Sequence, residues 1–475
     1  MSLRDKYEVV IGLEVHAQLL TKTKAYSSDE NTYGATPNTK TSVISLGHPG
    51  TLPKSNAKVI EYAVRLGIAV GSDIRERNEY ARKNYFYADL PKGYQITQDT
   101  TPICNGGIIT IKDADGNPKD IKITRIHMEE DAGKSIHDLD PFHTLVDLNR
   151  AGVPLVEVVS EPDVRSSDEA YQYINEVRKL VRYLDICDGN MEEGSLRCDA
   201  NISVMLKGAT EFGTKVEVKN MNSTRNVKRA IEFEIDRQIE LLEEGGTVVH
   251  ETRSFNAANN TTISMRHKEE ANDYRYFPEP DLQAVIVTEE YIAQVKSQLP
   301  PLPKELYSKF TTEYGLSDYD TNILIDEKGI ALYYNELCSH TKNYKSAANF
   351  VNGSVKSYLN ENAVSISDFS ISTEQLATLI SIVDDERISN SVATSKVFPA
   401  MLSSNKTAEE IAQKLVIETN PEEDKKEYIS TPSGPSSDLP EIKGLRYPNA
   451  NNLTVGEGTD YVLFEFGKYQ PPFAS

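Results

Sequence analysis

Two segments of the chain, 9–18 and 121–131, alternate polar and aliphatic residues in the way that is typical of β-strands. Because alternate residues of a strand point to the same face of a sheet, each segment is expected to gather its polar side chains on one side. These side chains are Glu14 and His16 in the first segment and Arg125, His127 and Glu129 in the second. Carboxylates and imidazoles on one sheet face suit a divalent metal ion. The pattern therefore points to an enzyme that handles phosphate.

A phosphoryl-transfer site needs carboxylate oxygens to hold magnesium and cations to offset the phosphate charge. The side chains that could hold the metal are Glu14, His16, Glu129, Glu130, Glu193 and Asp199. The cations that could face phosphate are Arg125, Lys134, Arg150, Arg197 and Arg275. No Walker-type glycine loop occurs in the sequence, so a P-loop nucleotide site is not expected. Histidine is a less usual partner of magnesium than oxygen, which leaves the identity of the metal open at this point.

Each of these signals also has an ordinary structural explanation. Taken alone, Glu14 and His16 would more often belong to a solvated sheet face, and the acidic run 129–131 would more often end a strand. Lys83 and Lys92 would be surface lysines by default. No single one of these signals decides the function.

The composition bounds the class of protein. The 475 residues, 39% hydrophobic and 26% charged, are those of a soluble globular chain with roughly three domains. No apolar run is long enough to span a bilayer, and four scattered cysteines show neither metal nor disulfide spacing, so we expect a cytoplasmic protein. The net charge of −21 argues against broad binding to polyanions such as DNA, although a local basic patch is compatible with it.

Strand-like segments outnumber helices up to about residue 290 and do not alternate regularly with them, which predicts an α+β fold with a large, mostly antiparallel sheet. Amphipathic helices are expected at 57–70, at 225–244 and after the capping box 166–169. The proline-rich segment 299–303 is the clearest linker. Beyond it the pattern turns helical, with helices expected at 305–314 and 321–337 and several short ones from 347 to 417.

Several longer strings of residues resemble one known family, the B subunits of the tRNA-dependent amidotransferases. The similarity runs in order from about residue 7 to 290, and more loosely to about 417. The strings that carry it lie at 11–16, 82–87, 127–134, 147–150, 161–163 and 273–281. Six motifs in the same order make a chance similarity very improbable.

The resemblance implies a specific activity. Members of this family use ATP and Mg²⁺ to phosphorylate the side-chain carboxylate of Glu-tRNA(Gln) or Asp-tRNA(Asn), and ammonia then displaces the phosphate. An amidase A subunit releases the ammonia from glutamine, and a small C subunit completes a heterotrimer. The implied fold is a cradle related to glutamine synthetase and the guanido kinases, followed by an all-α helical domain and a small helical tail that hold the tRNA. On this basis we expect a catalytic cradle at 1–298, a helical domain at 303–345, a small helical tRNA-binding tail at 346–420 and an atypical irregular C-terminus at 421–475.

The resemblance also implies roles for individual residues. It places Glu14, His16 and Glu130 at the metal and phosphate site, with Glu129 and Asp199 as neighbouring metal ligands. Among the cations identified above from their residue types, Arg125, Lys134, Arg197 and Arg275 are expected to bind the cofactor. The residues expected to act in catalysis are Glu130, Lys83 and Arg150. The residues expected along an ammonia route are Lys83, Tyr87, Lys92 and Glu130. No amidase-type Ser-Ser-Lys signature appears, so glutamine hydrolysis is expected of a partner.

Two other functions compete with this one. The first is a noncatalytic tRNA-docking subunit of the same complex whose acidic site has decayed, which the intact motifs oppose. The second is a stand-alone metal-dependent hydrolase. It is the weakest alternative, because the sequence shows neither a nucleophile elbow nor a tight cluster of histidine and aspartate. Whether the substrate is Glu-tRNA(Gln), Asp-tRNA(Asn) or both is not encoded in any segment.

Overall fold

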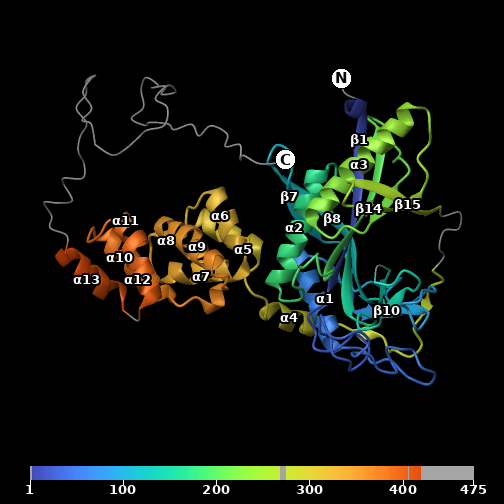
Figure 1. Cartoon of the computed structure of the whole chain (residues 1–475), viewed down its shortest axis with the longest axis horizontal. Helices are drawn as coiled ribbons and strands as arrows, with labels where there is room; N and C mark the ends of the chain where they lie inside the picture. Colours follow the sequence, from blue (N-terminus) through green and yellow to red (C-terminus); the bar gives the residue numbers. More distant parts are fainter. Residues whose placement is uncertain (1–2, 138, 268–273, 405, 419–475) are drawn as a thin grey trace, which may run out of the picture. The chain divides into compact units, whose positions relative to one another are not determined.

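A computed structural model describes residues 3–137, 139–267, 274–404 and 406–418. Its main feature is a ten-stranded sheet in the order β15-β14-β13-β12-β1-β11-β8-β6-β2, with β7 paired to β8 (Figure 1). Neighbouring strands are antiparallel except for the parallel pair β13 and β14, so the sheet is mixed. The strands of this sheet are β1 (Tyr7–Gln18), β2 (Asp73–Ile74), β6 (Cys104–Asn105), β7 (Ile108–Lys112), β8 (Pro118–Glu130), β11 (Pro154–Ser160), β12 (Leu196–Leu206), β13 (Val216–Lys219), β14 (Glu251–Asn256) and β15 (Thr261–His267). The predicted α+β class with a large sheet is confirmed.

Smaller sheets join the loops beside the main sheet. One of them has the strand order β16-β4-β5, and its middle strand β4 carries Lys83. Their strands are β3 (Arg77–Asn78), β4 (Ala81–Asn84), β5 (Tyr94–Thr97), β9 (Lys134–Ile136), β10 (Leu145–Asp147), β16 (Phe277–Pro278) and β17 (Val285–Ile286).

One face of the sheet is covered by three helices, α1 (Ala57–Val70), α2 (Ser167–Tyr183) and α3 (Thr224–Glu243). The core between them contains Ile11 and Leu13 of β1, both fully buried. All three helices were predicted from their apolar stripes, with ends within one residue of the observed ones for α1 and α3. The α2 N-cap is Ser166, whose hydroxyl accepts a hydrogen bond from the backbone N–H of Glu169, as the capping box indicated.

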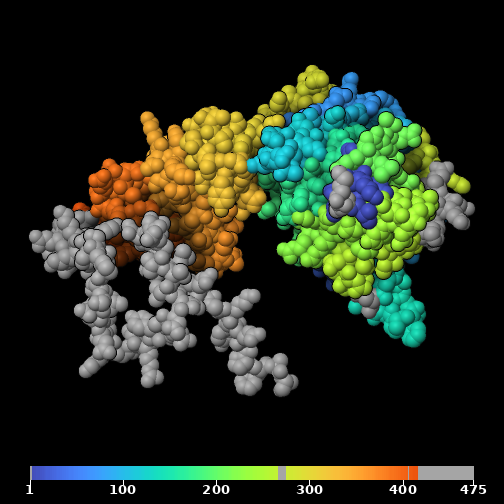
Figure 2. All heavy atoms as spheres, turned by 90° about the horizontal axis from the view of Figure 1, so that it is seen from above, coloured from blue at the N-terminus to red at the C-terminus, as the bar shows by residue number. Residues whose placement is uncertain are grey.

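The start of β1 is tied down at the surface. The short 3-10 helix η1 (Leu3–Lys6) packs against α3, as the blue and green residues show in Figure 2. Arg4 donates a 2.7 Å hydrogen bond to Glu232 of α3, and Lys6 donates one of 2.8 Å to Glu243. These contacts hold the end of the central strand.

The chain from residue 289 onward is helical as far as it is described. The helices are α4 (Glu289–Ser297), α5 (Pro303–Thr312), α6 (Asp318–Ile325), α7 (Lys328–His340), α8 (Tyr344–Phe350), α9 (Lys356–Asn362), α10 (Thr373–Asp384), α11 (Asn390–Val392), α12 (Phe398–Ser403) and α13 (Ala408–Glu418), with the short turns η2 (Val351–Val355), η3 (Ile366–Asp368) and η4 (Ala393–Val397). The prediction of a single helix at 321–337 is wrong, because the helical conformation is interrupted at 326–327 and two helices, α6 and α7, form. In the part of the chain that the structure describes, no helix combines the length and the apolarity that crossing a bilayer requires. The irregular C-terminus predicted at 421–475 lies outside the described residues.

Candidate active site

The face of the sheet opposite the helices carries polar side chains from four adjacent strands. Strand β1 lies between β12 and β11, and β11 lies between β1 and β8. Arg197, His16, Glu157 and His127 are paired across these strands and form one row. Two residues further along, Asp199, Glu14 and Arg125 lie in the next row, together with Val159. The predicted period-two pattern therefore does bring Glu14, His16, Arg125 and His127 to one face.

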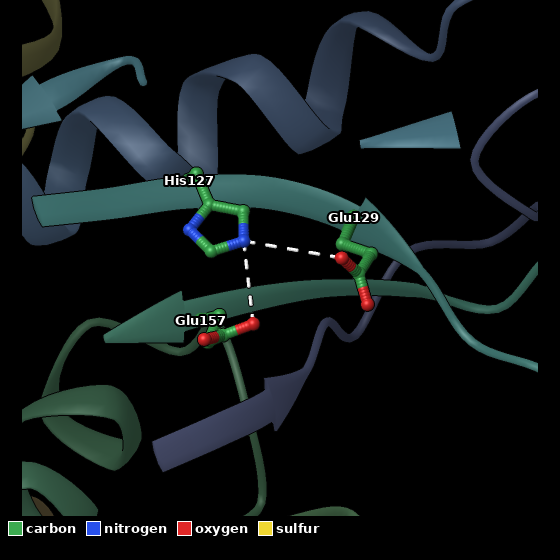
Figure 3. Close-up of side chains that lie close together, drawn as sticks. All are labelled: His127, Glu129 and Glu157. Atoms are coloured by element: carbon green, nitrogen blue, oxygen red, sulfur yellow. Dashed lines mark ion pairs between the residues drawn. The ribbon is translucent and has the colours of Figure 1, made fainter. Parts of the chain in front are cut away.

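A buried carboxylate links two histidines in the first row. Oε2 of Glu157 lies 3.2 Å from Nε2 of His127 and 3.3 Å from Nε2 of His16. His127 also lies 3.9 Å from Glu129, and Figure 3 shows its ring pointing between the two carboxylates. The side chains of His127, Glu129 and Glu157 are at least nine-tenths buried, and their ligand atoms lie within 4.8 Å of one another.

The charges in this cluster decide its protonation. Burial by itself lowers the pKa of His127, but the carboxylates of Glu157 and Glu129 outweigh it and raise the pKa to about 9. Burial likewise opposes protonation of His16, yet Glu157 raises its pKa. Burial raises the pKa of Glu157, but the two histidines hold it well below the ordinary value. His127 is therefore a cation near neutral pH and forms an ion pair with Glu157, and the same carboxylate favours the charged form of His16.

A second cluster consists of three carboxylates, from Glu14, Asp199 and Glu217, whose oxygens also lie within 4.8 Å of one another. Lys219 forms an ion pair with Asp199 and lies 2.9 Å from Glu217. Burial raises the pKa of Glu14, and the nearby carboxylate of Glu157 raises it further. One lysine thus faces several crowded carboxylates, an arrangement that favours binding of a further cation.

Glu130 lies apart from both clusters. It is the last residue of β8, and as the neighbour of Glu129 it points to the other side of the strand. Its Oε1 forms an ion pair with Lys92 and accepts a 2.8 Å hydrogen bond from the N–H of Ile96. Glu130, Glu14 and His16 were expected to share one metal centre, but the structure does not bring Glu130 together with the other two.

Lysines line the side of the site near Glu129 and Glu130. Nζ of Lys83 lies 3.6 Å from Glu129, whose pKa is lowered, against its burial, chiefly by this lysine. Lys24 is fully buried, and burial lowers its pKa to about 8 although Asp29 is 4.0 Å away. The sequence offered no signal for Lys24, because a lone lysine in a loop is ordinarily exposed.

A pocket of about 270 Å³ opens at the other end of the polar face. Gly12 and Glu14 form part of its floor, and Asn201 contributes an amide that donates a 2.9 Å hydrogen bond to Glu14. Its apolar walls include Pro162 and Phe212. The pocket thus adjoins the three-carboxylate cluster.

Comparison with known proteins identifies the family. A family model described as the GatB/GatE catalytic domain matches residues 9–293, and one described as the GatB domain matches 332–429. The chain is 49% identical to the B subunit of the aspartyl/glutamyl-tRNA(Asn/Gln) amidotransferase from Syntrophotalea carbinolica, over 86% of this chain and 85% of that protein. It is 50% identical to the protein of the same name from Hydrogenovibrio crunogenus, over 86% and 85%. The chain belongs to the GatB/GatE family.

Several residues that were predicted from the sequence to act in this GatB/GatE family member lie outside the clusters. Lys134 is exposed on β9, and Tyr87 is 64% exposed, with its ring edge against Tyr85. Arg275 is exposed, and its carbonyl accepts a 2.7 Å hydrogen bond from Asn84. Glu193 is exposed in the turn before β12. Asp273, at the start of the last motif, lies outside the described residues.

Three important residues of the clusters were missed from the sequence. Glu157 is the only charged residue within the apolar strand β11, and an isolated carboxylate in a buried strand was a usable signal. Glu217 and Lys219 alternate with two valines in β13, a pattern that was present but too short to stand out.

Proposed function

We propose that this chain phosphorylates the side-chain carboxylate of Glu-tRNA(Gln) or Asp-tRNA(Asn) with ATP and amidates it with ammonia. The names of its relatives support the substrate class. The observation that carries the proposal is the order of groups along β1. Gly12 lines the pocket, Glu14 belongs to the carboxylate cluster, and His16 lies in the histidine row. Beyond it Gln18 reaches Asp131, which follows Glu129 and Glu130.

These groups match the parts of ATP. Same-face residues of a strand are about 6.6 Å apart, so Gly12 and His16 are separated by roughly 13 Å. That distance suits a nucleotide whose base occupies the pocket and whose phosphates extend toward His16. Arg125 lies in the row of Glu14, and its buried Nε has no hydrogen-bond partner among the described residues. A buried guanidinium nitrogen of this kind suits a phosphate oxygen.

The residues fit magnesium at the three-carboxylate cluster. Glu14, Asp199 and Glu217 offer hard oxygen ligands, and burial together with the nearby carboxylate of Glu157 raises the pKa of Glu14, so a divalent cation would stabilise its charged form. These three would hold the ion, which supplies charge neutralisation to the phosphates when bound. Of the other predicted ligands, His16 belongs to the ion-paired row and Glu129 is paired with Lys83, and magnesium prefers oxygen to nitrogen.

The proposed reaction has two steps. A carboxylate oxygen of the aminoacyl side chain attacks the γ-phosphorus of ATP, the bond to the β-γ bridging oxygen breaks, and ADP leaves. Ammonia then attacks the carbonyl carbon of the acyl phosphate, inorganic phosphate leaves with the original carboxylate oxygen, and the nitrogen loses a proton. Without phosphorylation the leaving group would be oxide, which is why a carboxylate needs ATP before it accepts ammonia.

Ammonia is proposed to arrive from a partner amidase, with a small third subunit completing the complex. The lysine side of the site supports a polar route, since Lys83 and Lys92 are largely buried and each is paired with a carboxylate. Tyr87 is proposed at the outer end of this route because most of its ring is exposed. Glu130, Lys83 and Arg150 remain the proposed catalytic residues, and Lys134 and Arg275 are retained as outer contacts to the nucleotide.

We also propose the division of the chain at 298–303 and 345–346, with the sheet acting as a glutamine synthetase-like cradle and the helices after 303 binding tRNA. A cytoplasmic location follows from a tRNA substrate. The alternative of a noncatalytic docking subunit is opposed by the paired charges on the sheet face, since a decayed site would have no reason to keep buried carboxylates and histidines together.

Isotope transfer tests the proposal. Glu-tRNA(Gln) with ¹⁸O in the side-chain carboxylate is incubated with the reconstituted complex, ATP, Mg²⁺ and ammonia. One ¹⁸O is expected in inorganic phosphate for each amide formed. An Asp199→Asn complex should lose the transfer, whereas Asp236→Asn, an exposed acid on α3, should keep it. Amide formation without ¹⁸O in phosphate would refute the acyl phosphate, and a complex that binds tRNA but never consumes ATP would favour the docking role.

A further inference from the structure

Asp131 is a buried carboxylate surrounded by donors. Its Oδ2 accepts a 2.8 Å hydrogen bond from Nη2 of Arg197 and a 2.7 Å hydrogen bond from the amide of Gln18. Nε of Arg150 lies 3.8 Å from the same oxygen. Burial raises the pKa of Asp131, but Arg197 and Arg150 outweigh it and lower the pKa, so the carboxylate is ionised.

The backbone around Asp131 is fixed as well. Its N–H donates to the carbonyl of Val153 at 2.8 Å, and its carbonyl accepts from the N–H of Gly152 at 2.9 Å. Arg150 donates to the carbonyl oxygens of Ala132 and Gly133 at 3.0 and 2.6 Å. The backbone of Asp131 is therefore held in place by hydrogen bonds. A side chain that is hydrogen-bonded to its carboxylate is restricted in its movement as well.

Arg197 is the group on Asp131 that reaches the polar face. It is paired across β1 with His16 and so begins the row that contains Glu157 and His127. Among the described residues, Asp131 is the only hydrogen-bond partner of the Arg197 side chain, and 32% of that side chain is exposed. One edge of the guanidinium is thus held while the rest remains available.

The lysines of the same face are less available. Lys83 is paired with Glu129, and Lys219 is paired with Asp199 and Glu217. Asp131 carries one negative charge against the two positive charges of Arg197 and Arg150, so it does not neutralise both guanidinium groups.

We propose that Asp131 is a positioning residue that holds the Arg197 guanidinium so that its open edge binds the phosphoryl group during its transfer. The inference rests on the proposed function. Asp131 itself does not touch the substrate, and its effect passes through Arg197. A guanidinium that is held before the reaction binds a planar phosphoryl group without losing side-chain freedom at that moment.

A double-mutant cycle tests the proposal in the complete complex with ammonia as nitrogen donor. The variants are Asp131→Asn, Arg197→Met and the combination of both, and kcat and KM for ATP are measured for each. Glu234→Gln is the matched control, because Glu234 is also a buried carboxylate held by two arginines but lies on α3. Asp131→Glu is the second variant, since it keeps the charge while moving the oxygens.

Asp131→Asn is expected to lower kcat/KM for ATP by at least about tenfold, which corresponds to 1.4 kcal/mol. The double variant is expected to be no slower than Arg197→Met alone, because the role of Asp131 disappears with Arg197. If Asp131→Asn does not assemble, Asp131→Glu must give the same pattern with wild-type assembly.

Independent losses that multiply in the double variant would overturn the positioning role, as would an effect no larger than that of Glu234→Gln. If the wild-type complex still needs ATP, these outcomes contradict only the role of Asp131 and not the proposed function. A wild-type complex that amidates without ATP would instead overturn the proposed function, and the role of Asp131 with it.

Discussion

The His127–Glu157–His16 row makes a prediction about stability that depends on pH. Replacement of Glu157 by Gln keeps the shape of the side chain but removes the charge between the two imidazoles, which lie 3.2 and 3.3 Å away. Burial then acts on His127 without its main opposing carboxylate, so its pKa is expected to fall to or below the ordinary value of 6.5.

The magnitude follows from the shift in His127. A rise from 6.5 to about 9 in the folded state is worth about 3 kcal/mol, since one pKa unit is about 1.4 kcal/mol. The folded chain binds the proton more tightly than the unfolded chain does. The contribution is therefore fully present below pH 6.5 and is lost as the pH rises through about 9. Glu157→Gln lacks the part of this contribution that Glu157 supplies, while Glu129 remains, so the two proteins should differ most at and below pH 6.5 and converge above pH 9.

Urea unfolding of the full chain between pH 6 and 9.5, with EDTA present, measures this difference. Groups that do not interact with Glu157 cancel when the variant is subtracted from the wild type, whereas His16, whose pKa Glu157 also raises, adds to the difference in the same direction. Asp140→Asn serves as the control, because Asp140 pairs with an exposed histidine, His143, at 3.1 Å and should change little. A difference between wild type and Glu157→Gln that stays constant over this pH range would refute the assignment of His127 as a cation held by Glu157.

Two further predictions concern the ends of the polar face. Gly12→Val should raise KM for ATP at least about tenfold while changing the unfolding free energy by less than about 1 kcal/mol. An added Cβ at Gly12 comes no closer than 4.0 Å to its neighbours, so the strand accepts it while its methyls enter the pocket, and unchanged ATP kinetics would exclude this pocket as the nucleotide site. Lys83→Met should reduce amidation from glutamine more than amidation from added ammonia in the reconstituted complex, and equal losses with both donors would remove Lys83 from the ammonia route.

Much of the site follows from local pattern. The alternation in 9–18 and 121–131 placed Glu14, His16 and His127 on the correct face, because strand geometry assigns faces with a period of two whatever the neighbours are. It could not say which strands lie side by side. That information resides in the order β12-β1-β11-β8, in which β1 pairs with two strands that are more than a hundred residues away in sequence.

The separation of Glu129 from Glu130 has a different reason. The resemblance placed both at one metal site, although strand alternation alone would have separated them. Adjacent residues of a strand point to opposite sides, so Glu129 meets Lys83 while Glu130 meets Lys92. By contrast, Glu217 could only be grouped with Glu14 and Asp199 once β13 was known to pair with β12.

The position of β1 in the middle of the sheet links the fold to the chemistry. A slip of its register by one residue would turn Glu14 and His16 into the core and expose Leu13 and Val15, which are fully buried. The slip is opposed on both sides, because β1 is paired along most of its length with β12 and along its second half with β11. It is also opposed at its start, where η1 is bound to α3. The burial that stabilises the sheet therefore fixes the spacing of the pocket, the carboxylates and the histidines, so a mutation that weakens the register should impair ATP use before it unfolds the chain.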